Sequence, residues 1–277
     1  MADTTGGTRL IPLAAKGAAI GAANTVPGVS GGTIAVVMGI YDPLIEAIGD
    51  FLSPRWKRHL AFLAPVLAGI ATGIAGFAWI IEVGLARIPE QTFFFFAGLI
   101  VGSLPFIARQ LHGSRLRAHH IPVCLGACAL LVLQATLGKP AMSEAITRVT
   151  ATTIPPLLGA GAIATATMVI PGVSGSFVLL VTGMYATFLH AIRTVNIPVL
   201  LVLAAGAALG LVAVSKVMNL LVKRYHATTY WLILGLVAGS VVGVWPGVSS
   251  IRAAFLDALA VALGVASALL LGTRPSR

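Results

Sequence analysis

Residues 27–41 read PGVSGGTIAVVMGIY, and residues 171–185 read PGVSGSFVLLVTGMY. Eight of the fifteen aligned positions are identical, and the same offset of 144 residues aligns the Ala-Ile dipeptide at 47–48 with another at 191–192. Proline lacks a backbone donor and glycine adopts conformations closed to other residues, so each Pro-Gly pair is expected to stop a helix. The chain therefore carries one helix-breaking element twice.

The composition indicates an integral membrane protein. Hydrophobic residues make up 58% of the chain, charged residues make up 9%, and the mean hydropathy is +0.99. This is too apolar for a soluble domain of 277 residues. The net charge of +10 does not indicate a nucleic-acid partner, because the basic residues are scattered through short loops and form no stripe with aromatics. The bilayer is the partner that this composition predicts.

Hydropathy predicts six membrane spans and two irregular segments. A bilayer core about 30 Å thick needs about 20 mostly apolar residues per helix. The six spans are 60–85, 91–110, 121–138, 198–222, 228–247 and 253–272. The segments 11–50 and 150–195 are apolar on both sides of PGVSG. Each is either a broken spanning helix with an addition, or a re-entrant hairpin that enters and leaves on one side.

A second self-similarity extends the repeat beyond the motif. At an offset of 137 residues, AGLIVGS at 97–103 is echoed by LGLVAGS at 234–240, and the glycines at 69 and 73 align with those at 206 and 210. We therefore expect an all-α polytopic protein with a single transmembrane domain, 1–277, made of repeat 1 (11–138) and repeat 2 (150–272). Small residues four apart let helices approach closely, and such faces leave room for a homodimer.

The distribution of basic residues favours re-entrant PGVSG elements. If each element enters and leaves on one side, twelve of the eighteen Lys and Arg residues share one side with both termini, and five face the other. The positive-inside rule assigns the first side to the cytoplasm. Each repeat then crosses the membrane three times, so the second repeat is inverted and the two tips meet near the midplane. This is the plan of many secondary transporters.

The two motifs are predicted to hold an anion. Ser30 and Ser174 are expected to cap the helices that follow, while glycines leave unobstructed N–H groups at the helix starts. A purely structural kink is the alternative. The predicted phosphate-binding residues of the motifs are Pro27, Gly28, Ser30, Gly31, Gly32, Thr33, Pro171, Gly172, Ser174, Gly175 and Ser176, with Asn24 one turn before the first motif.

Charged residues near the membrane interior are further candidates, because charge is costly there unless it is used. Lys16, Lys216 and Arg193 are expected to draw a phosphate into the cavity, or else to snorkel to the interface. Asp42, Glu46 and His190 are candidates for proton coupling, with burial raising the pKa of the acid; the alternative is that they are solvated helix ends.

The sequence offers no positive case for catalysis. It contains no convincing catalytic triad or paired carboxylates, and its histidines and cysteines have no spacing typical of a metal site. The motifs also lack the Lys-Ser/Thr ending of a nucleotide-binding P-loop. We therefore expect a transporter without catalytic residues, metal or cofactor, and not an enzyme.

Residues 24–48, NTVPGVSGGTIAVVMGIYDPLIEAI, and residues 168–192, MVIPGVSGSFVLLVTGMYATFLHAI, resemble the bacterial and archaeal polyprenyl-phosphate transporter family. The resemblance implies a multi-pass protein of the prokaryotic cytoplasmic membrane. It would return undecaprenyl phosphate, the carrier lipid of cell-wall polymers, from the outer to the inner leaflet. The second copy departs from the first at Ser176 and Phe177 and replaces the acidic pair by Ala186 and His190.

Two other functions fit the same helix starts. A secondary transporter of a small soluble anion needs a cavity closed to lipid, whereas a lipid carrier needs a lateral opening. An enzyme acting on lipid phosphates needs a nucleophile or metal carboxylates near the tips, and the chain has few acids. The favoured mechanism is alternating exposure of one phosphate site by rocking of the two repeats.

Overall fold

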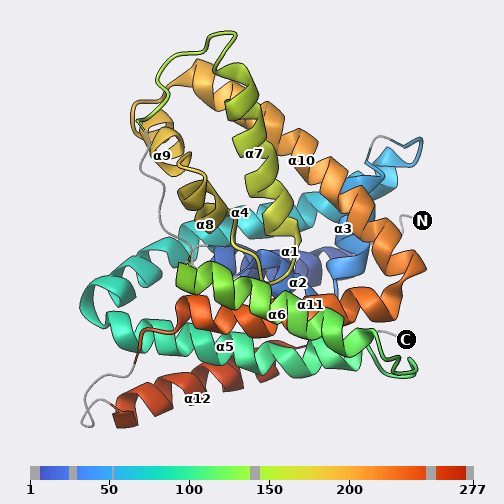
Figure 1. Ribbon diagram of the computed structural model, residues 1–277. Helices are drawn as coiled ribbons and strands as arrows, with labels where there is room; N and C mark the ends of the chain where they lie inside the picture. Colours follow the sequence, from blue (N-terminus) through green and yellow to red (C-terminus); the bar gives the residue numbers. More distant parts are fainter. Residues whose placement is uncertain (1–6, 25–29, 52, 138–143, 248–253, 273–277) are drawn as a thin grey trace.

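The computed structural model describes residues 7–24, 30–51, 53–137, 144–247 and 254–272, and every regular element in these residues is a helix (Figure 1). In chain order the helices are α1 (Gly7–Asn24), α2 (Gly31–Val37), α3 (Tyr41–Gly49), α4 (Trp56–Arg87), α5 (Pro89–Arg109), α6 (His120–Leu137), α7 (Ile154–Val169), α8 (Gly175–Val181), α9 (Tyr185–Arg193), α10 (Ile197–Arg224), α11 (His226–Val244) and α12 (Ala254–Leu271).

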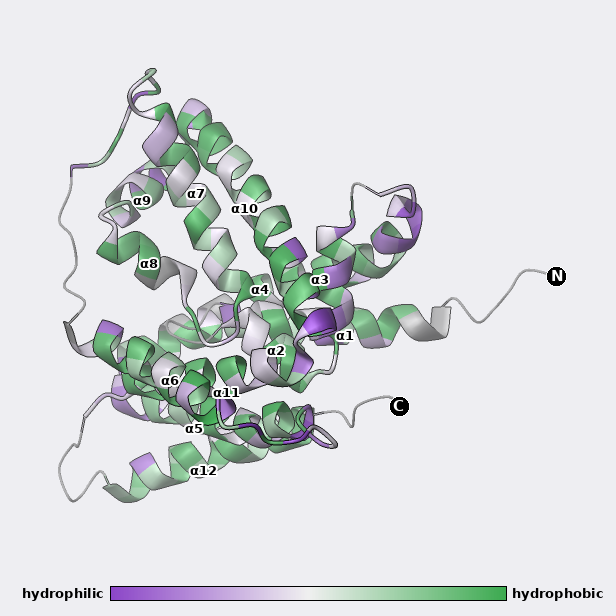
Figure 2. Cartoon of the chain, turned by 45° about the vertical axis from the view of Figure 1, so that its right-hand side comes forward, coloured by the Kyte–Doolittle hydropathy of each residue, from purple (hydrophilic) through white to green (hydrophobic). Residues whose placement is uncertain are grey.

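Each of the six predicted spans coincides with one helix. Among the described residues, α4, α5, α10, α11 and α12 are long and apolar enough to cross a membrane, while α6 and α7 are apolar but shorter. The predicted ends differ from those of α4–α6 and α10–α12 by at most four residues. Figure 2 shows hydrophobic residues along the lengths of these helices and hydrophilic residues mainly at their ends. An all-helical, multi-pass membrane protein is thereby confirmed.

Both irregular segments consist of one longer helix followed by two short ones. The first contains α1, α2 and α3, and the second contains α7, α8 and α9. The short helices are separated at Gly39 and Gly183, whose φ angles are 66° and 74°. Glycine adopts this left-handed conformation without steric cost, so it ends a helix sharply. These two glycines occupy the same position in the two copies of the motif.

Four helix pairs hold the molecule together. Helix α1 packs along α4, α7 along α10, α5 along α12, and α6 along α11. Glycines permit the close approach in every pair: a Cβ added at Gly73 would collide with the backbone of Ala18, and one at Gly210 would collide with the backbone of Ala162. The packing role predicted for the repeated glycines is confirmed, because those at 69, 98, 102, 206, 235 and 239 also face the backbone of a neighbouring helix.

Helix α2 lies at the centre of the largest buried cluster. All seven of its residues are buried, and it contacts α1, α3, α5 and α7. Figure 1 shows α7 and α10 diverging from the layer formed by α5, α6, α11 and α12, with α8 and α9 beside α7. The start of α4, the end of α5 and the turn between α10 and α11 lie on one side of the molecule.

The packing glycines lead to a stability prediction. Gly73→Leu is expected to destabilise the protein by about 1–3 kcal/mol, because the new side chain forces α1 and α4 apart. Gly76→Leu, one turn further along α4, is the control, because a Cβ at Gly76 meets no atom within 4 Å. Thermal unfolding of the two purified variants in one detergent measures the difference. Equal melting temperatures would contradict the packing role.

Candidate functional site

The tertiary structure brings the two PGVSG motifs into direct contact. The Gly172 N–H donates to Thr33 Oγ1 at 3.0 Å, and the Ser30 hydroxyl donates to the Ile170 carbonyl at 3.3 Å. The Tyr41 hydroxyl donates to the Val169 carbonyl at 3.2 Å. These bonds join residues 128 to 140 positions apart in the chain. The segments that contain the two motifs are therefore in direct contact in the folded chain.

The predicted capping hydrogen bonds are wrong. Ser30 and Ser174 do occupy the N-cap positions of α2 and α8, both with extended backbone, but neither side chain makes a cap hydrogen bond. The Ser30 hydroxyl turns instead to Ile170 of the other motif. A hydroxyl at a helix start has two competing uses, and here the contact between the motifs is the one made.

Both helix starts open into one cavity of about 620 Å³. Its polar end contains Asn24, Ser30 and Ser174, and its walls come from the apolar faces of α7, α8 and α10. The full lining is Asn24, Ser30, Gly31, Ala160, Gly161, Ala164, Thr165, Met168, Val173, Ser174, Gly175, Leu179, Phe188, Leu200, Leu203, Ala204 and Ala207. The cavity is thus amphipathic and contains no charged side chain from the described residues.

Glycine is required at the starts of α2 and α8, where neighbouring groups lie very close to the backbone. A Cβ at Gly31 would collide with the side chain of Asn24, and a Cβ at Gly175 would collide with the Ala164 carbonyl. A Cβ at Gly32 would lie 3.0 Å from the Val169 carbonyl oxygen. Asn24 therefore lies directly over the start of α2, at the cavity wall.

Some predicted residues lie outside the described structure. Pro27 and Gly28 fall in residues 25–29, which are not described, and the side chain of Ser176 is not described either. The residues of the second motif that correspond to Pro27 and Gly28 are described. Pro171 is buried, and Gly172 forms the turn with a φ angle of 87°. A Cβ at Gly172 would lie 2.7 Å from the backbone of Leu236 in α11.

The three predicted cations lie away from this cavity. The Lys16 ammonium donates to the carbonyl of Met38, at the C-terminal end of α2, where the helix dipole favours a positive charge. Lys216 is exposed on α10, and Arg193 is exposed at the end of α9. Hydropathy and spacing do not reveal the direction in which a long side chain points, and none of these three cations lines the cavity.

The acidic residues predicted for proton coupling bind partners from the second half of the chain. Asp42 accepts a hydrogen bond from the buried Tyr230 hydroxyl at 2.7 Å. Glu46 pairs with Lys223 at 2.9 Å, and this hydrogen bond lowers the pKa of the Glu46 carboxyl. The predicted rise in pKa by burial is wrong for Glu46, because its side chain is 47% exposed beside an ammonium group. His190 is partly buried in the last turn of α9.

Several residues of the site were missed from sequence. The cavity walls include Thr165, Met168 and Phe188, which belong to apolar segments without a distinguishing signal. Tyr41 did carry a signal, because both motifs end in a glycine, one residue and a tyrosine. Tyr230 and Lys223 carried no sequence signal, because their partners, Asp42 and Glu46, lie 188 and 177 residues away.

The Thr33 contact leads to a second stability prediction. Thr33→Val removes the acceptor of the buried Gly172 N–H and is expected to destabilise the protein by about 1–3 kcal/mol. Thr33→Ser keeps the hydroxyl and serves as the matched control. Thermal unfolding of both variants in detergent is the measurement. A Thr33→Val protein as stable as Thr33→Ser would rule out an energetic role for this bond.

Comparison with known proteins assigns the chain to a family. Residues 20–258 match the family described as VCA0040-like, undecaprenyl phosphate translocase-like. A polyprenyl-phosphate transporter of Vibrio cholerae is 38% identical over 244 residues, which cover 83% of this chain and 76% of that protein. A polyprenyl-phosphate transporter of Staphylococcus aureus is 33% identical over 269 residues, which cover 93% of this chain and 94% of that protein.

Both relatives are named as transporters, which agrees with the prediction of a transporter and not of an enzyme. No solved structure matches this chain. The match of residues 20–258, together with the identities to both relatives, covers most of the sequence. The chain therefore belongs to the undecaprenyl phosphate translocase-like family.

Proposed function

We propose that this protein moves polyprenyl phosphate across the cytoplasmic membrane of a prokaryote, with the phosphate head group at the polar end of the 620 Å³ cavity. The names of both relatives support the substrate. The observation that carries the placement is that residues of both repeated motifs line this one cavity. Ser30 with Gly31 and Ser174 with Gly175 form corresponding positions of its wall.

The chemistry of the cavity suits a lipid phosphate. A phosphate group loses its water when it enters the membrane and needs donors in exchange, which hydroxyl and amide groups supply. An isoprenoid tail needs the opposite, and the α7 and α10 walls contribute alanine, leucine and methionine side chains. The cavity is also open to the surface, as a long-tailed substrate requires. A small soluble anion would need neither the opening nor the apolar walls.

The proton, in this proposal, travels on the phosphate itself. The described lining offers no cation to balance a dianion, and Glu46 is held ionised by Lys223. A phosphate monoester has a second pKa of about 6, so it gains a proton readily when it leaves water. The head group therefore crosses as a monoanion held by neutral donors, which bind it without trapping it.

We infer that the chain consists of two inverted repeats with re-entrant motif segments. Helices α1–α6 and α7–α12 follow the same order of long and short elements. The repeated glycines support this, since those of α4 face α1 and those of α10 face α7, while those of α5 face α12 and those of α11 face α6. Three spans per repeat invert the second copy and place both termini in the cytoplasm.

The unequal packing of the two halves supports alternating exposure. Helix α3 packs along α10, and a Cβ at Gly49 would lie 3.1 Å from the Lys216 backbone nitrogen. Within the described residues, the corresponding helix α9 makes no comparable contact with α4. In this proposal the protein has a second state in which α9 packs along α4 and α3 separates from α10. The head group becomes exposed to the other side of the membrane in that state.

Transport by the purified protein tests the proposed function. Vesicles containing the protein and a labelled polyprenyl phosphate are expected to move the intact lipid between leaflets, and no inorganic phosphate is released. Protein-free vesicles provide the background rate. Uptake of inorganic phosphate without lipid movement would instead support the small-anion transporter.

A further inference from the structure

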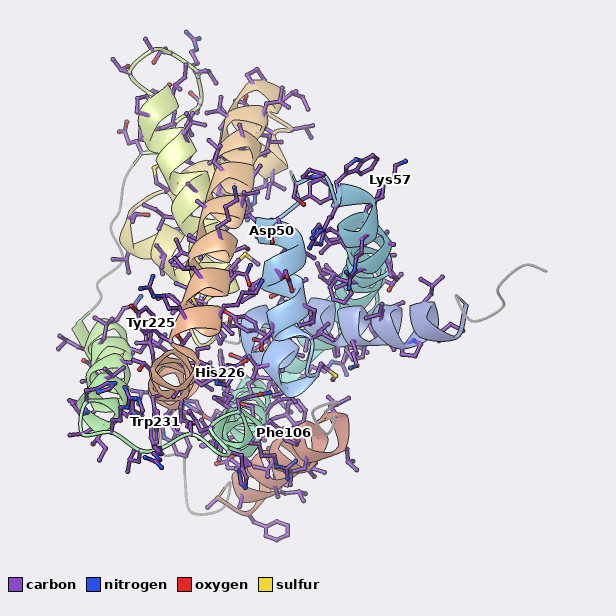
Figure 3. All side chains as sticks on the ribbon, turned by 90° about the vertical axis from the view of Figure 1, so that its right-hand side faces the viewer. Asp50, Lys57, Phe106, Tyr225, His226 and Trp231 are labelled. Atoms are coloured by element: carbon purple, nitrogen blue, oxygen red, sulfur yellow. The ribbon has the colours of Figure 1, made fainter. Side chains whose placement is uncertain are left out.

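A second cavity of about 330 Å³ lies where the turn between α10 and α11 meets the loop between α5 and α6. It shares no residue with the first cavity. Its lining is Ser114, Arg115, Arg117, His120, Arg224, Tyr225, His226, Ala227 and Thr228. We call this cavity the basic pocket. Figure 3 shows Tyr225 and His226 together at the start of α11, with Trp231 further along the same helix.

The basic pocket gathers positive charge without a balancing acid. The charge comes from three arginines, and no carboxylate lines the pocket. In the part of the chain that the structure describes, none of the three guanidinium groups forms a salt bridge. The Arg224 guanidinium lies 5.7 Å from the ring of Tyr225. Arginine groups that converge without carboxylate partners are suited to binding phosphate, because each offers several donors in one plane.

The frame of the pocket is held by specific contacts. The backbone N–H of Arg117 donates to His120 Nδ1 at 3.2 Å. His120 is 3% exposed, and its ring stacks on that of Trp231 with 6.2 Å between the ring centroids. His119 and Thr228 form a hydrogen bond of 3.3 Å between the loop and α11. The loop and the start of α11 are thus joined at two places. These two contacts hold together the backbone segments that carry the three arginines.

The pocket also lies beside the membrane surface. It is formed at the end of α10 and the start of α11, both of which are candidate spans. Leu116, between two of the arginines, is 62% exposed. Basic pockets at the ends of membrane helices are typical sites for phosphate-bearing head groups. The first-turn N–H groups of α11 face the same region and favour an anion further.

We propose that the basic pocket binds a phosphate group at the membrane surface, separately from the transport cavity. The phosphate is carried by a lipid head group, either of the substrate or of an anionic phospholipid, or is free in solution. Its recognition depends on Arg115, Arg117 and Arg224 acting together. When the ligand is the transported lipid, the pocket collects or releases its head group at the membrane surface. That role as a station for the substrate rests on the proposed function.

Binding to purified full-length protein tests the proposal. The probes are inorganic phosphate, farnesyl phosphate, and vesicles of phosphatidylcholine with or without phosphatidylglycerol. The variant R115Q/R117Q/R224Q is expected to bind phosphate-bearing probes about tenfold more weakly. The control R55Q/K57Q/R58Q removes the same charge from the N-terminal end of α4 and is expected to change binding less than about twofold. Equal losses in both variants overturn the proposal.

Two further variants separate folding and transport from binding. R115K/R117K/R224K keeps the charge that orients the chain, and is expected to bind more weakly than wild type because the paired donors are lost. Ala204→Trp fills the transport cavity and is expected to leave binding at the basic pocket intact. Binding that disappears with Ala204→Trp and survives R115Q/R117Q/R224Q overturns the proposal.

The probes also distinguish the sources of phosphate. Competition by inorganic phosphate alone supports recognition of the phosphate group in any carrier. Binding only to phosphatidylglycerol vesicles supports a structural lipid, and binding only to farnesyl phosphate supports a substrate station. Binding of none of the three probes overturns the proposal, even when transport itself is normal.

Discussion

Replacing Ala204 by tryptophan is expected to reduce polyprenyl-phosphate transport to the rate of protein-free vesicles. Ala204 lies on α10 and lines the cavity that both PGVSG motifs share. A tryptophan there is expected to occupy space that the head group and the first part of the tail need. The rate at which labelled lipid changes leaflet in reconstituted vesicles measures the effect.

The matched control for this variant is Ala208→Trp. Ala208 lies one turn further along α10, is exposed, and does not line the cavity. Both variants place the same bulky residue on the same helix, so a shared loss of transport would point to insertion or stability instead of the cavity. A normal rate with Ala204→Trp and folded protein would remove the cavity from the transport route.

The double variant S30A/S174A is expected to lose most of its affinity for the head group. Both hydroxyls lie at the polar end of the cavity, at corresponding positions of the two motifs. When phosphate binds, the Ser30 hydroxyl is expected to donate to it instead of to the Ile170 carbonyl. A buried phosphate that loses two donors has no water to replace them, so each lost bond to the charged group weakens binding by about tenfold or more. Binding of farnesyl phosphate and lipid transport are measured side by side, in a protein whose basic pocket carries R115Q/R117Q/R224Q.

The control for the double variant is S240A/S267A. These hydroxyls donate to carbonyls of their own helices, so their removal is expected to leave binding and transport unchanged. Each single variant, Ser30→Ala or Ser174→Ala, is expected to have an intermediate effect. Unchanged transport in S30A/S174A would reject these serines as ligands of the phosphate.

The spanning helices and the close packing at the repeated glycines followed well from sequence, whereas the choice of partner in each helix pair did not. A span needs a run of apolar residues, and close packing in a membrane needs small residues at helical spacing, so both leave a direct trace in the chain. Gly73 and Gly210 show this, because each was predicted from a repeat and each lies against a neighbouring backbone. The short helices after each motif were less visible, since a single glycine separates them.

The candidate site depended more on long-range contacts. Ser30 was placed correctly at the start of α2, but its hydroxyl bonds to Ile170, 140 residues away. Glu46 was expected to be buried and protonatable, but the ammonium of Lys223 holds it ionised. In both cases the partner is chosen by how the two halves dock, and no local pattern records that choice.

Apolar length was enough to establish a helical membrane protein, and glycine spacing with the duplicated PGVSG element was enough to predict two related halves. These properties are local, because each depends on residues within a few turns of one helix. The shared cavity, the position of the cations and the basic pocket came only from the folded molecule. They depend on side chains from distant segments, whose directions are decided when the helices pack against one another.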